Sequence, residues 1–329
     1  MNPINLKRRE VLGAVALTLA SPHAGTLAAT DYPSRRIRII SPFPAGGIVD
    51  QAARIVNEFF AAELGQPVIV EALPGAGSAI GTQAVARSEP DGYTCVLAGI
   101  SHVSAPLLQP TQYHPINDFA AAGLLCYGRT VAVVPADSPV RTLKDLVELA
   151  KSKPGALNYL NPGNGTVAHL STELLKMQAG ISMQSVAYKG LPPGMQDLVA
   201  GRLDFGAISL PLPLPLIKAG RLRAIGIMTA AREPELPDVM TYTEQGFANA
   251  QVLTWYIFAF PAATPKPVLA RFNAVINKAL ADSGIRSRLS AANLSPTPPS
   301  TPEQAQALMR DDYARIARLI KDANIQPGT

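Results

Sequence analysis

The chain has 329 residues, of which 47% are hydrophobic and 16% charged, and it carries a net charge of +5. The apolar content is high enough for a buried core, which excludes an intrinsically disordered chain. This length allows two domains of roughly 100–200 residues each. The positive excess is small and no basic stripe alternates with aromatic residues, so nucleic-acid binding is also excluded as the expected function.

Residues 1–29 have the pattern of a signal peptide for export to the periplasm. Three basic residues at 7–9 precede the apolar run 11–20, and small residues follow up to Ala29. This run is too short to cross a bilayer as a helix of the mature protein, and cleavage is expected between Ala28 and Asp31. The arginine pair fits a twin-arginine signal, and a Sec signal fits equally well. Cleavage would remove three basic residues and one acidic residue, leaving a net charge of +3.

Beyond the signal peptide, strand-like and helix-like segments alternate along the chain. Predicted strands cover residues 36–41, 68–71, 94–98, 131–135, 158–160, 183–188, 203–208 and 222–228, and predicted helices cover residues 48–64, 80–87, 143–151, 168–178, 195–200, 267–282, 302–308 and 311–322. This alternation is typical of a mostly parallel sheet covered by helices on both faces. It occurs in two cycles, so the pattern predicts two similar α/β domains.

A glycine loop at residues 42–47 follows the first predicted strand and precedes a helical pattern. Gly46 and Gly47 have no Cβ, so an anion can approach their backbone N–H groups closely, and a helix start adds unpaired donors. Similar loops occur at residues 74–77 and 161–166. Ligands of open α/β sheets bind at the carboxyl ends of the strands, so two facing edges predict a cleft that closes on a small anion. An ordinary strand-to-helix turn explains the first loop equally well.

The common catalytic motifs are missing from the sequence. It contains no GxGxxG, Walker or GxSxG pattern, and His102, His114 and His169 lack the spacing of metal ligands. Cys95 and Cys126 form no CxxC pair, and both lie in apolar, strand-like runs. Two alternatives remain open for them, namely buried free thiols and a single disulfide. We therefore expect a non-enzymatic protein without metal or cofactor, and an exported hydrolase is the alternative from another class.

A series of short motifs runs in order from Tyr32 toward the C-terminus. They are Tyr32-Pro-Ser34, Pro42-Phe-Pro-Ala-Gly-Gly47 with Asp50, Gly65-Gln-Pro67, Pro74-Gly-Ala-Gly77, Pro90-Asp-Gly-Tyr93, residues 161–169, Tyr188-Lys-Gly190, Ile217-Lys-Ala-Gly220 and Leu236-Pro-Asp238. This set resembles the Bug receptors, the extracytoplasmic solute receptors of tripartite tricarboxylate transporters. The chain departs from the family pattern at residues 112–115 and in the proline-rich stretch 210–216, so the resemblance leaves the identity of the ligand open.

The resemblance implies an α/β fold of two Rossmann-like domains hinged as a Venus flytrap, in the periplasmic binding protein type II-like class. Domain 1 would comprise residues 30–131 and 252–329, and domain 2, residues 132–251, would be inserted in it with the ligand cleft between them. The implied function is capture of a small carboxylate or related polar solute for a membrane permease of the tripartite tricarboxylate type. Presentation of the loaded receptor to a sensor kinase is the alternative. We expect a monomer whose hinge strands lie near residues 125–134 and 252–260.

The resemblance also implies a ligand site made of loops from both domains. In domain 1 its residues are Phe43, Ala45, Gly46, Gly47, Asp50, Gly75, Ala76, Gly77, Ser78 and Ser101, and in domain 2 they are Asn161, Gly165, Thr166, Val167, Ala168, His169, Tyr188, Lys189 and Asp204. Thr166 is expected to cap a helix beginning near Val167, which leaves N–H groups for a carboxylate.

Some of these residues have a second interpretation that involves no ligand. Asp50 is expected to cap a helix rather than to contact an anionic carboxylate, which it would repel, and His169 can equally well orient its own loop. Lys189 can be a solvated charge, and Asp204 can organise the backbone around the cleft through hydrogen bonds.

Overall fold

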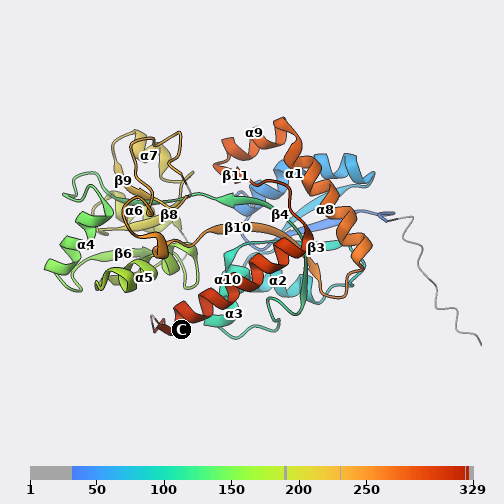
Figure 1. Cartoon of the computed structure of the whole chain (residues 1–329), viewed down its shortest axis with the longest axis horizontal. Coiled ribbons are helices and arrows are strands. Elements are labelled where there is room, and N and C mark those ends of the chain that lie inside the picture. The colour runs from blue at the N-terminus through green and yellow to red at the C-terminus, as the bar shows by residue number, and fades with distance from the viewer. Residues whose placement is uncertain (1–31, 189–190, 230, 323, 326–329) are drawn as a thin grey trace, which may run out of the picture. The chain divides into compact units, whose positions relative to one another are not determined.

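The computed structural model describes residues 32–188, 191–229, 231–322 and 324–325 (Figure 1). The predicted signal peptide and Lys189 therefore lie outside the described residues. From Pro33 onward the chain folds as one unit. Two parts of this unit differ in their sheets. We call residues 33–128 with 254–325 the large-sheet region, and residues 130–250 the inserted region.

The large-sheet region is built on a six-stranded mixed sheet. Its strands are β1 (Ile37–Ser41), β2 (Val68–Ala72), β3 (Thr94–Ala98), β4 (Phe119–Gly128), β10 (Thr254–Pro261) and β11 (Leu294–Pro296), in the spatial order β11-β4-β10-β3-β1-β2. β1 pairs in parallel with β2 and β3, whereas β10 pairs antiparallel with β3 and β4, and β11 pairs antiparallel with β4. Within this sheet the prediction of mostly parallel strands is therefore correct only for β1–β3, because β10 returns from the inserted region in the opposite direction.

Helices cover this sheet and bury their apolar stripes. They are α1 (Ile48–Leu64), α2 (Ala79–Ala86), α3 (Ile100–Leu108), α8 (Lys266–Ala281), α9 (Ser283–Ala291) and α10 (Pro302–Asp322), with a 3₁₀ turn η1 (Ala76–Ser78) before α2. Phe60 of α1 packs against Phe258 and Phe272 with ring centroids 5.4 and 5.3 Å apart, in the tilted and edge-on geometries that aromatic rings favour. α1 ends at Gly65, whose φ of +68° is a left-handed conformation that favours glycine.

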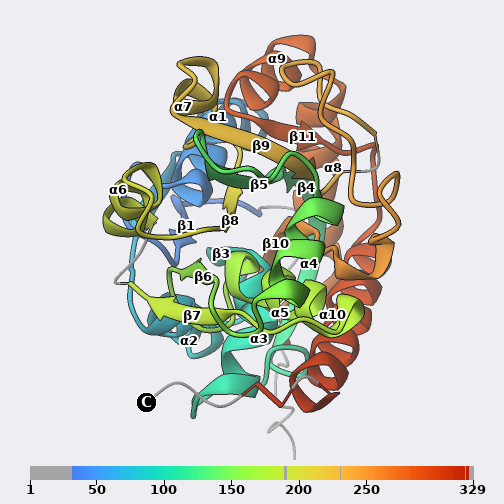
Figure 2. The same ribbon diagram turned by 90° about the vertical axis from the view of Figure 1, so that its left-hand side faces the viewer.

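The inserted region contains two small sheets and its own helices (Figure 2). Its strands are β5 (Thr130–Pro135), β6 (Asn158–Asn161), β7 (Gln184–Ala187), β8 (Gly206–Ser209) and β9 (Leu222–Ile227). Its helices are α4 (Leu143–Ser152), α5 (Val167–Ala179), α6 (Leu191–Val199) and α7 (Leu214–Lys218), together with the 3₁₀ turn η2 (Ala248–Ala250). β5 pairs antiparallel with β8 and β9, and β6 pairs in parallel with β7. Thr142 and Asp145 form a capping box at the start of α4.

Two segments connect these regions. The chain passes from β4 to β5 through Arg129, and it returns to β10 through residues 251–253. Buried apolar residues continue across the junction, with Val252 and Trp255 in the same cluster. The indole N–H of Trp255 donates to Asp312 Oδ2 at 2.7 Å, so its one polar group is satisfied inside the core. The junction is therefore packed as well as covalently connected.

Most predicted elements occur within a few residues of their expected bounds, and the differences have local causes. The sequence pattern does not predict α3, which contains Pro106, and the expected hinge strand near residues 125–134 covers only the end of β4, whose alanine and glycine content gives it low strand propensity. The tail helices expected at residues 302–308 and 311–322 are one continuous helix, α10.

Cys95 and Cys126 are buried free thiols on β3 and β4. β10 lies between these two strands, so the two cysteines are at least two strand spacings apart, about 9–10 Å across the sheet, and they are also offset along it. This separation exceeds the reach of a disulfide, which settles the open alternative in favour of free cysteines.

Candidate functional site

The loops after β1, β2 and β3 lie side by side at the carboxyl ends of three parallel strands, which is where ligands bind in open α/β sheets. We call residues 42–47 the first glycine loop and residues 74–78 the second glycine loop. A Cβ on Gly81 would lie 2.6 Å from the carbonyl oxygen of Leu73 and 3.0 Å from the Cα of Pro42, so only glycine allows this packing. The two loops therefore form one continuous edge.

Asp50 holds the first glycine loop in place. Its side chain is almost fully buried, and Oδ2 accepts hydrogen bonds from the N–H of Gly46 and from Nε of Arg54, both at 2.9 Å. Burial alone would raise the pKa of Asp50, but the hydrogen bonds and the charge of Arg54 outweigh it and lower the pKa below its ordinary value. The ionised carboxylate is directed at its own loop, which favours the structural interpretation of Asp50. Ala45 and Gly46 are exposed at the tip of the loop.

The second glycine loop has an unusual backbone. Gly75, Ala76, Gly77 and Ser78 all have positive φ, at 135°, 46°, 60° and 89°, and this conformation costs free energy at the two residues that are not glycine. Gln109, directly after α3, supports the loop by donating from Nε2 to the carbonyl of Ala76 at 2.6 Å. Backbone strain of this kind is concentrated at functional sites, so the loop is a candidate ligand contact.

Residues 161–166, the third glycine loop, join β6 to α5 in the inserted region. Asn161 organises this loop from a buried position. Its Oδ1 accepts the N–H of Gly163 at 3.0 Å, and its Nδ2 donates to Asn164 Oδ1 at 2.9 Å and to Ser185 Oγ at 3.0 Å. With these hydrogen bonds the side chain of Asn161 is committed to the shape of the loop.

The start of α5 offers backbone amides to an anion. Thr166 caps the helix, as expected, because its Oγ1 accepts the N–H of His169 at 3.4 Å. Nδ1 of His169 accepts the N–H of Gly165 at 3.2 Å, and burial lowers the pKa of His169, which keeps the ring neutral for this role. The next amides, at Val167 and Ala168, belong to the first helical turn, whose N–H groups have no carbonyl partner within the helix. They are the best-placed donors for a carboxylate in this loop.

One hydrogen bond joins the third glycine loop directly to the large-sheet region. Ser104 on α3 is fully buried, and its Oγ donates to the carbonyl of Gly165 at 2.7 Å. A Cβ on Gly165 would lie 2.8 Å from Cδ1 of Leu108 and 3.1 Å from Oγ of Ser104. Ser101, an expected ligand residue, is buried one turn earlier on the same helix. α3 therefore brings the third glycine loop to the side of the sheet that carries β1–β3.

Tyr188 and Asp204, two of the expected ligand residues, both form hydrogen bonds within the inserted region. Tyr188 does follow β7, but its hydroxyl donates to Asp197 Oδ2 on α6 at 2.7 Å. Asp204 precedes β8, and its Oδ2 accepts the N–H of Asn158, the first residue of β6, at 2.7 Å. Asp204 therefore lies at the amino edge of these strands, opposite the third glycine loop, and it organises backbone there. The strand predicted at residues 203–208 is β8, which starts at Gly206, so Asp204 lies before the strand and not at its carboxyl end.

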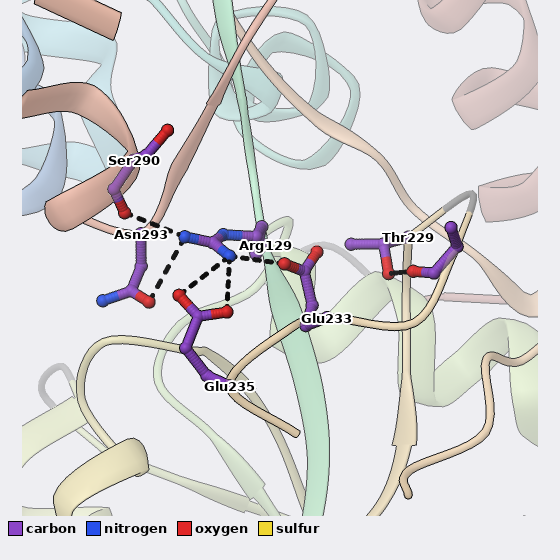
Figure 3. Close-up of polar contacts among 7 residues, drawn as sticks. Arg129, Thr229, Glu233, Glu235, Ser290 and Asn293 are labelled. Carbon is purple, nitrogen blue, oxygen red and sulfur yellow. Dashed lines mark hydrogen bonds and ion pairs between the residues drawn. The ribbon is translucent and has the colours of Figure 1, made fainter. Parts of the chain in front are cut away.

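A polar cluster around the buried side chains of Arg129 and Glu233 lies where the chain crosses from β4 to β5 (Figure 3). Arg129 is 5% exposed, and its Nη1 donates to Glu233 and to both carboxylate oxygens of Glu235, at 3.1 and 3.3 Å. Its Nη2 donates to the carbonyl of Ser290 at 3.0 Å and to Asn293 Oδ1 at 3.4 Å. We call these five residues the Arg129 cluster. The carboxylates belong to the inserted region and the other two acceptors to the large-sheet region.

Sequence reasoning missed Ser104, Gln109 and Arg129. No local motif marks them, since each acts through a partner far away in the sequence. A surface hollow of about 530 Å³, lined by residues of the segment 106–118 and by Tyr313, includes none of the expected ligand residues. Within the described part of the chain, no group of three or more His, Cys, Asp or Glu side chains is placed to hold a metal ion, and no helix is long and apolar enough to cross a membrane.

The mixed sheet, the inserted α/β region and the likeness to solved structures define a periplasmic binding protein of the type II-like class. Residues 52–325 match the family described as the tripartite tricarboxylate transporter family receptor, and the chain belongs to this family. It is 35% identical over 318 residues to the UPF0065 protein in the tcbD-tcbE intergenic region of Pseudomonas sp. strain P51, covering 96% of this chain and 94% of that protein. It is 30% identical over 302 residues to Protein BugT of Bordetella pertussis, covering 91% of this chain and 92% of that protein. The resemblance to Bug receptors is confirmed.

Solved structures of the same fold include two with carboxylates. A Rhodopseudomonas palustris protein with adipate is 28% identical, with a TM-score of 0.81 over 91% of this chain and 100% of that chain. MatC from Rhodopseudomonas palustris with bound malate is 29% identical, with a TM-score of 0.75 over 88% of this chain and 100% of that chain. The family is one of solute receptors rather than enzymes, in agreement with the expected function.

Proposed function

We propose that the chain is an exported receptor that captures a small carboxylate between the large-sheet and inserted regions. In this proposal the regions act as the two expected domains, residues 30–131 with 252–329 and residues 132–251, and they hinge at Arg129 and at residues 251–253. The observation that carries the proposal is the hydrogen bond of Ser104 to Gly165, since it links the start of α5 to the side of the sheet that bears the first and second glycine loops. The related proteins with adipate and malate support a carboxylate ligand.

Backbone amides, rather than cationic side chains, would bind the carboxylate. Hydrogen bonds to a charged group contribute roughly 1.5–3 kcal/mol each, so three or four of them allow micromolar affinity after the costs of association. Val167 and Ala168 would supply two, and the exposed tip of the first glycine loop would supply others. Arg54, the cation beside that loop, is already paired with Asp50. None of the expected ligand residues that the structure describes is a lysine or arginine, which favours monocarboxylates and dicarboxylates over tricarboxylates.

The partner proposed for the loaded receptor is a membrane permease of the tripartite tricarboxylate type. Membership of the receptor family supports this choice over presentation to a sensor kinase. Export through the predicted signal peptide would bring the receptor to the periplasm, where it acts as a monomer that closes on its ligand. The remaining site residues carried over from the family, Phe43 and Gly47 of the first glycine loop and Lys189 after β7, belong to the same proposal.

A thermal-shift screen of the refolded mature chain tests this proposal. Refolding removes a ligand retained through purification, and the panel contains adipate, malate, other carboxylates with one to three acid groups, and amino acids. A ligand at 100 times its dissociation constant adds about 2.7 kcal/mol to the stability of the folded state, which shifts Tm by several degrees. A carboxylate hit confirmed by titration calorimetry is the expected result. Binding of amino acids alone, or of nothing in the panel, would overturn the assignment to carboxylates.

A further inference from the structure

Two polar contacts, one buried and the other partly buried, join the inserted region to the large-sheet region on opposite sides of the strands β4 and β10. In the sheet order, β3 lies on one side of this strand pair and β11 on the other. α3, which carries Ser104, follows β3, whereas Ser290 and Asn293 lie at the end of α9 and directly before β11. Figure 1 shows α3 on one side of these strands and α9 with β11 on the other. The contacts therefore flank the connection between the regions.

The first contact lies on the side of the glycine loops. Ser104 has no exposed surface and donates from Oγ to the carbonyl of Gly165 at 2.7 Å. The N–H of the same residue, Gly165, is taken by Nδ1 of His169 at 3.2 Å. The backbone carbonyl and N–H of Gly165, two residues before Val167, are thus both hydrogen-bonded. The partner of the carbonyl, Ser104, belongs to the large-sheet region. This contact stabilises the approach of the third glycine loop to the large-sheet region.

The second contact is the Arg129 cluster, on the opposite side (Figure 3). The guanidinium of Arg129 spans the junction, since Nη1 binds the carboxylates of Glu233 and Glu235 while Nη2 binds Ser290 and Asn293. Glu233 and Arg129 are both nearly fully buried, so solvent screens this ion pair little. The planar fork of arginine is suited to hold two groups at fixed directions. The cluster stabilises the approach of the two regions on the side away from the glycine loops.

We propose that Ser104 and the Arg129 cluster are opposing contacts that set the balance between open and closed forms of the receptor. Rotation about β4 and β10 that separates the glycine loops breaks the hydrogen bond of Ser104, and rotation that closes them further separates Arg129 from Ser290 and Asn293. Ser104 is then a positioning residue that favours the form able to bind ligand, and the Arg129 cluster opposes it. Apparent affinity scales with the population of the competent form, so the two contacts change it in opposite directions.

This inference rests on the proposed hinge, and substitutions at both contacts test it. Ser104→Ala removes the hydroxyl, with Ser171→Ala as the matched control, because Ser171 is also fully buried and donates to a carbonyl, that of Val167, within α5. Arg129→Lys keeps the charge beside Glu233 but loses the fork. Its control is Arg223→Lys, since Arg223 binds the carbonyls of Ala136 and Ser138 inside the inserted region.

The readouts are the dissociation constant of adipate, or of malate where adipate does not bind, and the radius of gyration of the ligand-free chain in solution scattering. A net hydrogen bond of about 1 kcal/mol corresponds to about a fivefold change in the equilibrium. Ser104→Ala is expected to weaken binding about fivefold and to increase the radius of gyration, and Arg129→Lys is expected to do the reverse. The control variants Ser171→Ala and Arg223→Lys are expected to lower Tm by amounts similar to those of Ser104→Ala and Arg129→Lys. They are expected to leave the dissociation constant and the radius of gyration unchanged.

The inference is supported if Ser104→Ala and Arg129→Lys change the dissociation constant and the radius of gyration in opposite directions. Changes in the same direction, or no change in either variant, overturn it. Asn293→Gly provides a milder variant should Arg129→Lys fail to fold, because Asn293 has a positive φ of 57° that glycine adopts freely. It removes one acceptor of the cluster and is expected to act in the direction of Arg129→Lys. Scattering separates this inference from the proposed function. If neither acid binds the unmodified chain, the ligand assignment fails, while the radii of the ligand-free variants still decide between opposing contacts and a rigid junction.

Discussion

Replacement of Val167 by proline tests the proposed role of the α5 amides most directly. Val167 is the first residue of α5, and Thr166 before it has φ −72° and ψ 160°. Proline is favoured at the first position of a helix, because its φ fits and its missing N–H has no helical partner. The extended conformation of Thr166 is one that a residue before proline adopts readily. The substitution therefore deletes one amide donor at little cost to the fold.

The size of the effect follows from the charge on the ligand. A hydrogen bond from the amide of Val167 to a carboxylate contributes roughly 1.5–3 kcal/mol, so its loss should weaken binding about 10- to 150-fold. Proline also restricts the unfolded chain, which should keep the change in folding stability within about 1 kcal/mol. Val167→Ala is the matched control, since it shortens the half-buried side chain and keeps the amide. It should change the dissociation constant by only about twofold.

Titration calorimetry with the best carboxylate of the screen measures the affinities, and thermal unfolding followed by circular dichroism checks the fold. If both variants bind as tightly as the unmodified chain, the assignment of a carboxylate to the start of α5 is refuted. If both variants lose the same amount of affinity, the effect belongs to the side chain of Val167 and the assignment is also refuted. Loss of affinity in the proline variant alone, with its Tm preserved, is the outcome that the amide model requires.

Two further predictions concern stability. Burial lowers the pKa of His102 to about 4 from 6.5, so between these pH values the unfolded chain binds a proton that the folded chain does not. The contribution of neutral His102 to the free energy of unfolding is complete above pH 6.5 and falls by about 3 kcal/mol as the pH drops to 4. His102→Asn should therefore flatten the dependence of the free energy of unfolding on pH in this range, as measured by denaturant titrations. Gly165→Ala should lower Tm more than Gly180→Ala, because both residues have positive φ, 79° and 62°, but only Gly165 lacks space for a Cβ. Equal losses in Tm would contradict the packing argument.

Elements with a complete local signal were predictable from the sequence. α1 begins and ends where expected, because glycines flank an amphipathic pattern on both sides and Gly65 adopts the left-handed conformation that ends a helix. The cap of α5 by Thr166 was predictable for the same reason, since a side-chain cap requires only residues within one helical turn. Asp204 was assigned to the wrong edge, because it stands at the start of its strand, both as predicted at residues 203–208 and as observed before Gly206, and not at the carboxyl end.

The contacts that join the two regions could not be predicted in the same way. Ser104 and Gly165 are 61 residues apart, and Arg129 and Glu233 are 104 residues apart. Neither pair belongs to a sequence motif, and α3, which presents Ser104, has a proline inside it and no marked helical signal. Such pairings depend on how the sheets associate, which local propensity and periodicity do not encode.

The proposed site divides its polar groups between building the loops and binding a ligand. Asn161 and His169 satisfy the N–H groups of Gly163 and Gly165, and Asp50 satisfies that of Gly46. The side chains that carry the family resemblance are therefore largely engaged in shaping the loops, and the amides left beside them are common to any carboxylate ligand. It follows that a substitution at Asn161 should weaken every ligand alike, because it deforms the shared amide site. Discrimination between one carboxylate and another must then come from side chains that meet the rest of the molecule, outside the motifs that identify the family.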